Sequence, residues 1–310
     1  MEPKTLQEAI LYFSDPVNCR EYLVARRWPK GVTCPKCGSK NVLFLEKYNR
    51  WHCREKHQSP QFTLKTGTVM EDSPIGLDKW LTAMWMVVNC KNGISSYEIH
   101  RTLGVTQKTA WFLDHQIRLM LGDEYANQLS GIVEVDETFI GGKPKNMHIR
   151  KRMKAQMRGQ TPEKAIVMGM LERETRKVRA KVIPNVRRDV LQDEILKQIE
   201  PGSFVFTDAH KGYKGIAKDF VHETVSHINE YVRGSVHTQG IENFWSLLKR
   251  GLNGTYVAVE PFHLSRYIDE QAFRYNNRKL SDAQRFDIAT RGMVGKRLTF
   301  AELTGKTADA

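Results

Sequence analysis

The sequence lacks an apolar run that could cross a membrane. The best candidate among its 310 residues, Trp80 to Val88, is far shorter than the roughly 20 residues that a spanning helix needs, and it lies in an amphipathic pattern. The first residues have neither a basic start nor a small-residue cleavage site, so no secretory signal is expected there. We therefore expect a cytoplasmic protein with no membrane partner, associated with the nucleoid if its source is a prokaryote.

Acidic residues are scarce relative to basic ones. The sequence has 48 Lys and Arg residues against 35 Asp and Glu residues, which gives a net charge of +13 at pH 7. This balance predicts a polyanionic partner such as a nucleic acid, although a generally basic soluble protein would have the same charge. Proline is also sparse, with 11 residues, and 40% of the residues are hydrophobic, so the chain is expected to fold.

Cysteine is scarce and odd in number, with five residues, so a disulfide framework is not expected in a chain without a secretory signal. Cys34 and Cys37 form a Cys-x2-Cys pair, and Cys53 is followed by His57. Three thiolates and one imidazole complete a tetrahedral Zn²⁺ site with no open position, which is typical of a structural zinc ribbon. Buried free cysteines are the alternative. His52 is a competing ligand, but it directly neighbours Cys53.

A helix-turn-helix layout follows the cysteine-rich segment. Residues 95–121 contain a short helical pattern, a turn at Gly104 and a longer helical pattern that begins with polar residues. In that layout Gln107, Lys108 and Thr109 would face the major groove of DNA. A plain helical hairpin without a DNA partner is the alternative.

From about residue 130 the pattern changes to strands. Residues 131–142 alternate as in a central strand, and strand-like runs follow at 164–175 and 176–184. An amphipathic helix over 187–199 then precedes a short apolar strand over 203–206. Three strands, a helix and another strand are the order that an RNase H-like mixed sheet requires, so we expect an α/β fold.

Three acidic residues lie at the edges of these elements. Asp136 is in the first strand, Asp208 follows the last one, and Glu242 lies near the start of an amphipathic helix that runs from about Gly240 to Leu252. In an RNase H-like sheet the first two carboxylates meet on adjacent strands. Three carboxylates so placed can hold two divalent metal ions in a cleft, which is the apparatus for cutting and rejoining phosphodiesters.

Each of these residues also has an ordinary structural explanation. Asp136 could be a strand-end cap and Asp208 a turn residue. Glu137 is a further acidic candidate, but its side chain should point to the opposite face of the strand. His210 and His237 could orient a phosphate or shuttle a proton, although hydrogen-bonded structural histidines are more common.

Basic side chains accompany the acidic ones. Lys249 follows Glu242 by seven residues, so both lie on one helix face, and Lys249 with its neighbour Arg250 could contact a phosphate beside the scissile bond. Residues 143–158 form a dense basic stretch that we expect to bind DNA phosphates, with a solvated loop as the alternative. Its candidate contacts are Lys143, Lys145, Arg150, Lys151 and Arg152.

These segments resemble a known family. VEVDETFIGG (133–142), TDAHKGY (207–213) and HTQGIENFWSLLKRGLNGTY (237–256), with the cysteine-rich segment before them, resemble prokaryotic insertion-sequence transposases of the DDE type that carry an N-terminal zinc ribbon. The resemblance runs from about residue 28 to residue 278. It implies an enzyme that binds the terminal inverted repeats of its element and catalyses Mg²⁺-dependent (or Mn²⁺-dependent) DNA strand cleavage and strand transfer.

The resemblance also implies residue roles and partners. Carried over by position, Asp136, Asp208 and Glu242 are the metal-binding triad, and Lys249 accompanies them. Asn243 is an alternative third ligand because related families sometimes use Asn, but a hard cation prefers an anionic oxygen. The implied partners are double-stranded DNA of the inverted repeats and of the target, together with further copies of the chain.

Two other functions remain open at this point. One is a zinc-ribbon DNA-binding regulator with a vestigial nuclease domain, and the other is a nuclease acting on RNA–DNA hybrids. The expected domains are N-terminal helices in 1–27, a zinc ribbon in 28–68, a helix-turn-helix-like DNA-binding module in 69–125, an RNase H-like catalytic domain in 128–295 and a C-terminal tail in 296–310.

Overall fold

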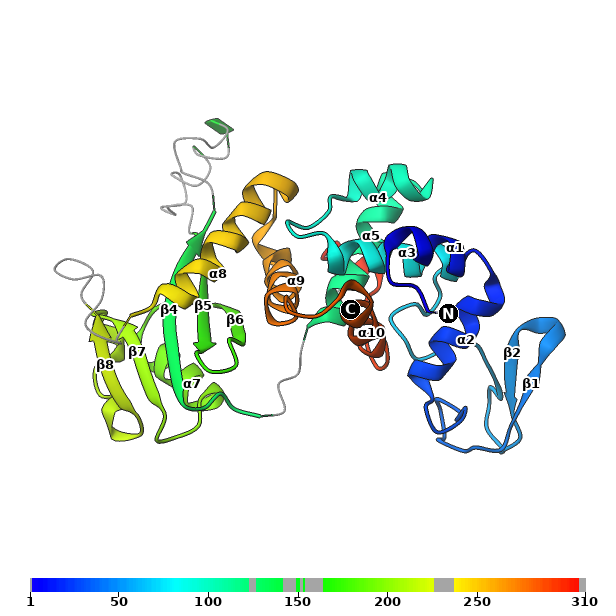
Figure 1. Ribbon diagram of the computed structural model, residues 1–310, viewed down its shortest axis with the longest axis horizontal. Coiled ribbons are helices and arrows are strands. Elements are labelled where there is room, and N and C mark those ends of the chain that lie inside the picture. Colours follow the sequence, from blue (N-terminus) through cyan, green and yellow to red (C-terminus); the bar gives the residue numbers. More distant parts are fainter. Residues whose placement is uncertain are drawn as a thin grey trace. The chain divides into compact units, whose positions relative to one another are not determined.

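The computed structural model describes residues 2–122, 127–141, 149–150, 153, 164–225 and 237–306. The chain divides into two compact units (Figure 1). Unit 1 combines Met1–Asp123 with Asn277–Ala310, and unit 2 is Glu124–Asn276. We predicted that the catalytic domain extends to residue 295, but the compact unit ends at Asn276 and the residues that follow it belong to unit 1.

Unit 1 is built around α3 (Leu77–Asn89). The sequence predicts an amphipathic helix here, but every residue of α3 from Trp80 to Val88 is buried, because other helices cover it on all sides. Helices α1, α2, α5 and α10 pack on it. The other helices of this unit are α1 (Leu6–Phe13), α2 (Pro16–Arg27), α4 (Ser96–Leu103), α5 (Gln107–Leu121), α10 (Asp282–Arg291) and α11 (Phe300–Leu303).

The packing of α10 explains why the compact unit ends before the predicted boundary. The ring of Phe286 in α10 contacts the rings of Phe13, Tyr22 and Trp85, with centroid distances of 5.7, 5.6 and 4.9 Å. Arg26 of α2 also forms an ion pair with Asp287 at 2.9 Å. The sequence shows that α10 has an apolar face, but it does not show which helices that face packs against.

The zinc-ribbon segment forms a small antiparallel sheet. Its strands are β1 (Val42–Leu45), β2 (Arg50–Cys53) and β3 (Gln61–Phe62), in the order β1-β2-β3. Trp51 of β2 lies between Phe62 and Trp28, with ring centroids 5.9 and 5.5 Å away. These aromatic contacts are a small apolar core, so a bound metal is an important part of what holds such a module together.

The helical module has the predicted layout. Ser95 and Glu98 form a capping box at the start of α4, and Thr106 caps α5 by accepting a hydrogen bond from the Thr109 N–H. Between the two helices Gly104 adopts the left-handed conformation, with φ of 60°, which glycine tolerates without strain.

Among the described residues, unit 2 contains one mixed sheet of five strands in the order β6-β5-β4-β7-β8. The central strand β4 is antiparallel to β5 and parallel to β7, and β7 is parallel to β8. This arrangement is the RNase H-like mixed sheet that the sequence predicts. The strands are β4 (Ile132–Ile140), β5 (Ala165–Glu172), β6 (Val178–Ile183), β7 (Phe204–Asp208) and β8 (Val221–Val225).

Helices cover both faces of this sheet. Helix α7 (Arg188–Gln198) packs through Leu191 and Ile195 on one face, with Val133, Val135 and other residues of one apolar cluster. Helices α8 (Gln239–Arg250) and α9 (Leu264–Asn276) cover the other face, and Figure 1 shows α8 lying across β4 and β5. The catalytic candidates lie on the α8 face.

None of the described helices is both long enough and apolar enough to cross a bilayer.

Candidate active site and zinc centre

The register of the sheet places Asp136 next to Asp208. Strands β4 and β7 run parallel, with Ile132 opposite Phe204 and Glu134 opposite Phe206. Two residues further along each strand, Asp136 and Asp208 lie at the same level. Because side chains alternate between the two faces of a strand, both carboxylates point to the face that α8 covers.

Glu242 reaches the same region from α8. It lies in the first turn of the helix, and its Oε1 accepts a hydrogen bond from the hydroxyl of the buried Thr238 at 3.0 Å. Its negative charge is among the causes that raise the pKa of Asp136, so the two carboxyl groups interact. The structure therefore brings the three predicted carboxylates to one region of unit 2.

Trp245 links α8 to the central strand. Its Nε1–H donates a hydrogen bond to Oδ2 of Asp136 at 2.9 Å. The residue opposite Asp136 on β5 is Gly169, and a Cβ at that position would lie 2.5 Å from the indole of Trp245. Gly169 is therefore the residue that lets the indole lie against the sheet and reach Asp136.

The electrostatics of this cluster favour a cation. Burial, together with the negative charges of Asp208 and Glu242, raises the pKa of Asp136 to about 6, although the Trp245 hydrogen bond opposes the shift. Carboxylate oxygens are the ligands that Mg²⁺ and Mn²⁺ prefer, so the donor set fits a divalent cation. Among the described residues, the cluster of side chains close enough to share one ion consists of the zinc ligands described below and does not include these three carboxylates.

Glu137 faces the other side of the sheet, as predicted. Its neighbour across β5 is Met168, which belongs to the α7-side cluster, and it accepts a hydrogen bond from the hydroxyl of Tyr213. Burial raises the pKa of Glu137 to about 8, with further contributions from the charges of Asp136 and Asp208. The raised pKa favours the protonated form of Glu137, which reduces the negative charge beside the cluster.

Glu134 holds the start of α8, a role that our reading of the sequence missed. Its fully buried carboxylate accepts a hydrogen bond from the Ile241 N–H at 3.0 Å and forms an ion pair with Arg173 at 2.7 Å. Nδ1 of His237 lies 3.5 Å from the same carboxylate. The spacing of Glu134 and Asp136 could have indicated this role, because residues two apart in a strand lie on the same face of the sheet.

The other catalytic candidates lie as follows. Asn243, Lys249 and Arg250 are exposed side chains of α8. The N–H of His210 donates to Oδ1 of Asp208 at 3.0 Å, and its Nδ1 accepts from the N–H of Gly212 at 3.2 Å. These are the structural hydrogen bonds that were one of the two alternatives for His210.

The four predicted zinc ligands converge in unit 1. The ligand atoms of Cys34, Cys37, Cys53 and His57 all lie within 4.8 Å of one another, and His52 is not among them. Sγ of Cys37 and Sγ of Cys53 are 3.6 Å apart, and Sγ of Cys34 is 3.7 Å from Nε2 of His57. A tetrahedral ion with metal–sulfur bonds of about 2.3 Å requires sulfur atoms about 3.8 Å apart, so these residues fit a structural zinc ion.

The predicted base-reading residues at the start of α5 contact other parts of unit 1. The Gln107 side chain donates to the hydroxyl of Ser96 at 3.1 Å, and the hydroxyl of Thr109 is 2.8 Å from that of Thr106. Nζ of Lys108 lies 4.4 Å from the centre of the Phe300 ring. Residues 296–310, which we expected to form a C-terminal tail, therefore include a segment that contacts α5.

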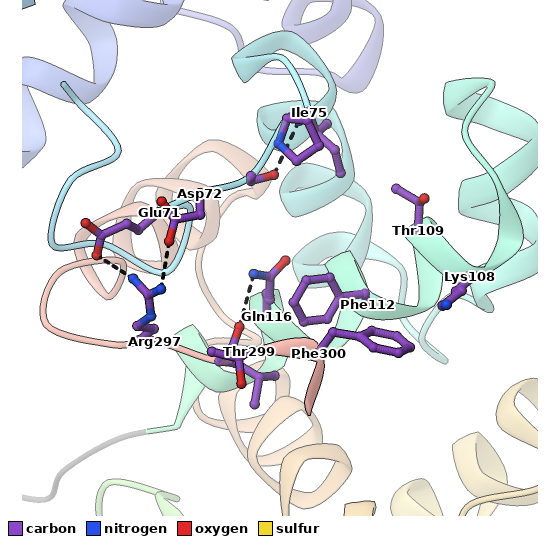
Figure 2. Close-up of a pocket in the computed structure, with 13 residues that line it drawn as sticks. Glu71, Asp72, Ile75, Lys108, Thr109, Phe112, Gln116, Arg297, Thr299 and Phe300 are labelled. Atoms are coloured by element: carbon purple, nitrogen blue, oxygen red, sulfur yellow. Dashed lines mark hydrogen bonds and ion pairs between the residues drawn. The ribbon is translucent and has the colours of Figure 1, made fainter. Parts of the chain in front are cut away.

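Figure 2 shows the cavity at this contact, where Phe112 of α5 lies beside Phe300; Lys108 and Thr109 of α5 also line it. Its volume is about 380 Å³. Arg297 closes one side through ion pairs with Glu71 at 2.9 Å and Asp72 at 2.7 Å. The helix-turn-helix hypothesis places Lys108 in the major groove of DNA, but in this structure its side chain contacts Phe300.

Of the basic stretch at 143–158, the structure describes little. Arg150 is exposed, whereas Lys143, Lys145, Lys151 and Arg152 lie outside the described residues. The prediction that these side chains bind DNA phosphates therefore stays a prediction.

The chain is similar to known transposase sequences. The family model of the ISXO2-like transposase domain matches residues 128–276, and that of the transposase zinc-ribbon domain matches residues 15–58. A protein of Halobacterium salinarum, described as an uncharacterized protein in transposable element ISH50, is 29% identical over 258 residues, which cover 78% of this chain and 84% of that protein. The first match ends where unit 2 ends, and the second includes all four predicted zinc ligands.

Proposed function

Because the chain belongs to the insertion-sequence transposases that carry an N-terminal zinc ribbon, we propose that it binds the terminal inverted repeats of its element and catalyses Mg²⁺-dependent DNA strand cleavage and strand transfer. The observation that carries the proposal is the register of β4 and β7. It sets Asp136 beside Asp208 on the sheet face from which Glu242 approaches.

In this proposal Asp136, Asp208 and Glu242 hold the divalent cations. Bound Mg²⁺ or Mn²⁺ would supply Lewis acidity and would neutralise the charge that develops on the phosphate oxygens. Trp245 fixes the orientation of Asp136 by donating to Oδ2 of its carboxylate. Glu134 anchors the start of α8 and so sets where Glu242 lies.

The proposed reaction has two steps of the same kind. In the first, a water oxygen forms a bond to phosphorus at the end of the element, the P–O3′ bond breaks, and the released oxygen takes up a proton. In the second, that 3′-hydroxyl attacks a phosphodiester of the target and displaces its 3′ oxygen. Lys249 and Arg250, exposed on the last turn of α8, are proposed to bind phosphates that flank the reacting one.

The N-terminal modules are proposed to select the DNA. The net charge of +13 favours a polyanionic partner, and the zinc ribbon and the helical module supply folded surfaces that could read the ends of the element. Binding of two element ends and a target implies more than one copy of the chain on the DNA. Binding to chromosomal DNA would also place the protein at the nucleoid.

A strand-transfer assay tests the proposal. Purified protein is mixed with a labelled duplex of the inverted repeat that brackets its gene, a plasmid target and Mg²⁺. We expect wild-type protein to form joined products and Asp136→Asn to lose at least about 100-fold in rate, because the removed charge is a cation ligand. Asp193→Asn is the matched control, since Asp193 lies on α7 and its side chain is 59% exposed.

The outcome also separates the alternatives. Full strand transfer by Asp136→Asn would exclude the proposed triad. Tight binding of the inverted repeat by wild-type protein with no cleavage in Mg²⁺ or Mn²⁺ would instead favour a regulator with a vestigial nuclease domain. Cleavage confined to RNA–DNA hybrids would favour the hybrid nuclease.

A further inference from the structure

The connection between α8 and α9 has an irregular backbone. At the end of α8 the chain continues through a π-helical turn, Gly251–Tyr256. Such turns are rare and occur frequently at functional sites. Tyr256 fixes the end of this turn, because its hydroxyl donates to the buried carboxylate of Glu270 and its ring packs edge-on against Tyr267 at 4.7 Å.

Val257, the next residue, is in a strained conformation. Its φ of 60° and ψ of −55°, with the Ala258 N–H donating to the carbonyl of Tyr256 at 2.6 Å, define the rare, strained form of γ-turn. Positive φ is particularly unfavourable for a β-branched residue. The turn is held on both sides, by Tyr256 and by Val259, which packs against the apolar core of the α8 face.

The strain presents an apolar side chain to solvent. Val257 is 76% exposed, so burial of its side chain does not explain why a valine occupies this position. Phe262 follows on the same connection and is 62% exposed, with its ring edge-on to His263 at 5.1 Å. The preceding turn of α8 carries the exposed cations Lys249 and Arg250. Two exposed apolar side chains thus follow a cationic helix end.

We propose that Val257 and Phe262 form an apolar wedge that contacts unstacked bases of the bound DNA while Lys249 and Arg250 hold the neighbouring phosphates. This inference rests on the proposed function. Apolar wedges that enter a base step and kink the duplex are an established means of deforming DNA, and they require flanking contacts to the phosphate backbone. Strain held at the apex of a turn is the kind of outlier that occurs at such sites.

The position of the wedge along the DNA follows from the length of α8. Val257 lies 15 residues after Glu242, which corresponds to about 22 Å along a helix. At 3.4 Å per base pair, this distance spans about six to seven base pairs of duplex. If the DNA follows α8, the distorted step lies within about two thirds of a helical turn of the scissile phosphate.

The test uses 2-aminopurine, whose fluorescence rises when a base unstacks. Duplexes of the inverted repeat that brackets the gene carry it at successive positions up to ten base pairs from the cleavage site. Full-length wild-type protein with Ca²⁺, which supports binding in place of Mg²⁺, should raise the fluorescence several-fold at one or two adjacent positions. Val257→Ala with Phe262→Ala should abolish the rise, and Val257→Ile with Phe262→Leu should retain it.

Two controls test whether the effect is specific. Val294→Ala removes another exposed valine, in unit 1, and should leave the signal unchanged. Val257→Gly removes both the side chain and the strain, so its melting temperature should equal or exceed that of the wild type while the signal is lost. That combination separates loss of the wedge from loss of the fold.

Two results would overturn the proposal. The first is a wild-type protein that binds and cleaves the ends with no fluorescence rise at any position. The second is a double variant that keeps the rise, and an altered oligomeric state of that variant in light scattering would then assign the surface to contacts with a second copy. A wild-type protein that neither binds nor cleaves the ends refutes the proposed function itself, and the wedge with it.

Discussion

At the scale of single residues, the unusual feature of unit 2 is a carboxyl group whose pKa is raised. Burial and the charges of Asp208 and Glu242 raise the pKa of Asp136 to about 6, from an ordinary value near 3.8. A carboxyl group whose pKa is raised by folding stabilises the folded state while it is protonated. That contribution is fully present below about pH 4 and is lost as the pH rises through about 6.

This shift predicts a specific pH dependence. The unfolding free energy of Asp136→Asn minus that of the wild type, measured in urea without added Mg²⁺, should increase between pH 4 and pH 6.5 by on the order of 2 kcal/mol. The affinity for Mg²⁺ should rise over the same interval, since the ligand must lose its proton, and should level off above it. A difference that stays flat across this interval would show that Asp136 titrates normally.

The orientation of Asp136 shows what the sequence could and could not reveal at this scale. The order of strands predicted that Asp136 and Asp208 would meet, and the register bears that out. Helical periodicity predicts that Trp245, three residues after Glu242, shares the helix face of Glu242 and Lys249. In the structure Trp245 is buried against the sheet, because Gly169 leaves space for its indole. That space depends on which residue of β5 lies opposite Asp136, and helical periodicity contains no such information.

At the scale of elements, the placement of α8 depends on a buried charge in β4. Glu134 receives the Ile241 N–H at the start of α8, where the partial positive charge of the helix N-terminus favours an anion. It also pairs with Arg173, whose Nη2 donates to the carbonyl of His237 at 2.6 Å. The helix that carries Glu242 is thus fixed at its first turn by one carboxylate.

Replacing Glu134 should therefore affect the reaction more than the binding of DNA. Glu134→Gln keeps an acceptor for Ile241 but removes the charge facing Arg173, so we expect a loss of about 2 to 3 kcal/mol in stability. We also expect a higher Mg²⁺ concentration for half-maximal cleavage, since Glu242 is less well placed, with little change in affinity for the inverted repeat. Cleavage assays at varied Mg²⁺ and DNA-binding titrations measure the two effects separately.

A matched variant shows whether the changed Mg²⁺ dependence is specific to Glu134. Glu194→Gln also removes a carboxylate that pairs with a cation in unit 2, but its partner Lys181 is 63% exposed, so the expected cost is below about 1 kcal/mol. It should not change the Mg²⁺ dependence. If Glu134→Gln lowers stability and leaves the Mg²⁺ dependence unchanged, Glu134 supports the fold but does not position Glu242.

At the scale of the whole molecule, the zinc ligands belong to unit 1 and the carboxylates to unit 2. The strands of the ribbon are only two to four residues long, so the module has little apolar surface to bury. Zinc removal should unfold the ribbon and lower affinity for the inverted repeat, while the urea transition of unit 2 stays in place. Metal analysis should find about one zinc ion per chain, and Cys53→Ser should lose it.

A cysteine outside the ribbon provides the control for that experiment. Cys90 is partly buried at the end of α3, and Cys90→Ser should retain zinc and DNA affinity. Zinc content that is unaffected by Cys53→Ser would remove this residue from the proposed ligand set. Loss of the unit 2 transition together with zinc would show that the two units do not unfold independently.

The division of the chain also predicts the effect of a substitution in α10. The sequence assigned residues 282–291 to the catalytic domain, but the structure packs Phe286 among Phe13, Tyr22 and Trp85 of unit 1. Phe286→Ala should therefore destabilise unit 1 by about 3 to 5 kcal/mol and leave the unfolding of unit 2 unchanged. Ile288→Ala, at a half-exposed position of the same helix, should cost much less. Hydrogen exchange resolves the two units, and faster exchange in β4 or β7 of Phe286→Ala would contradict the assignment of α10 to unit 1.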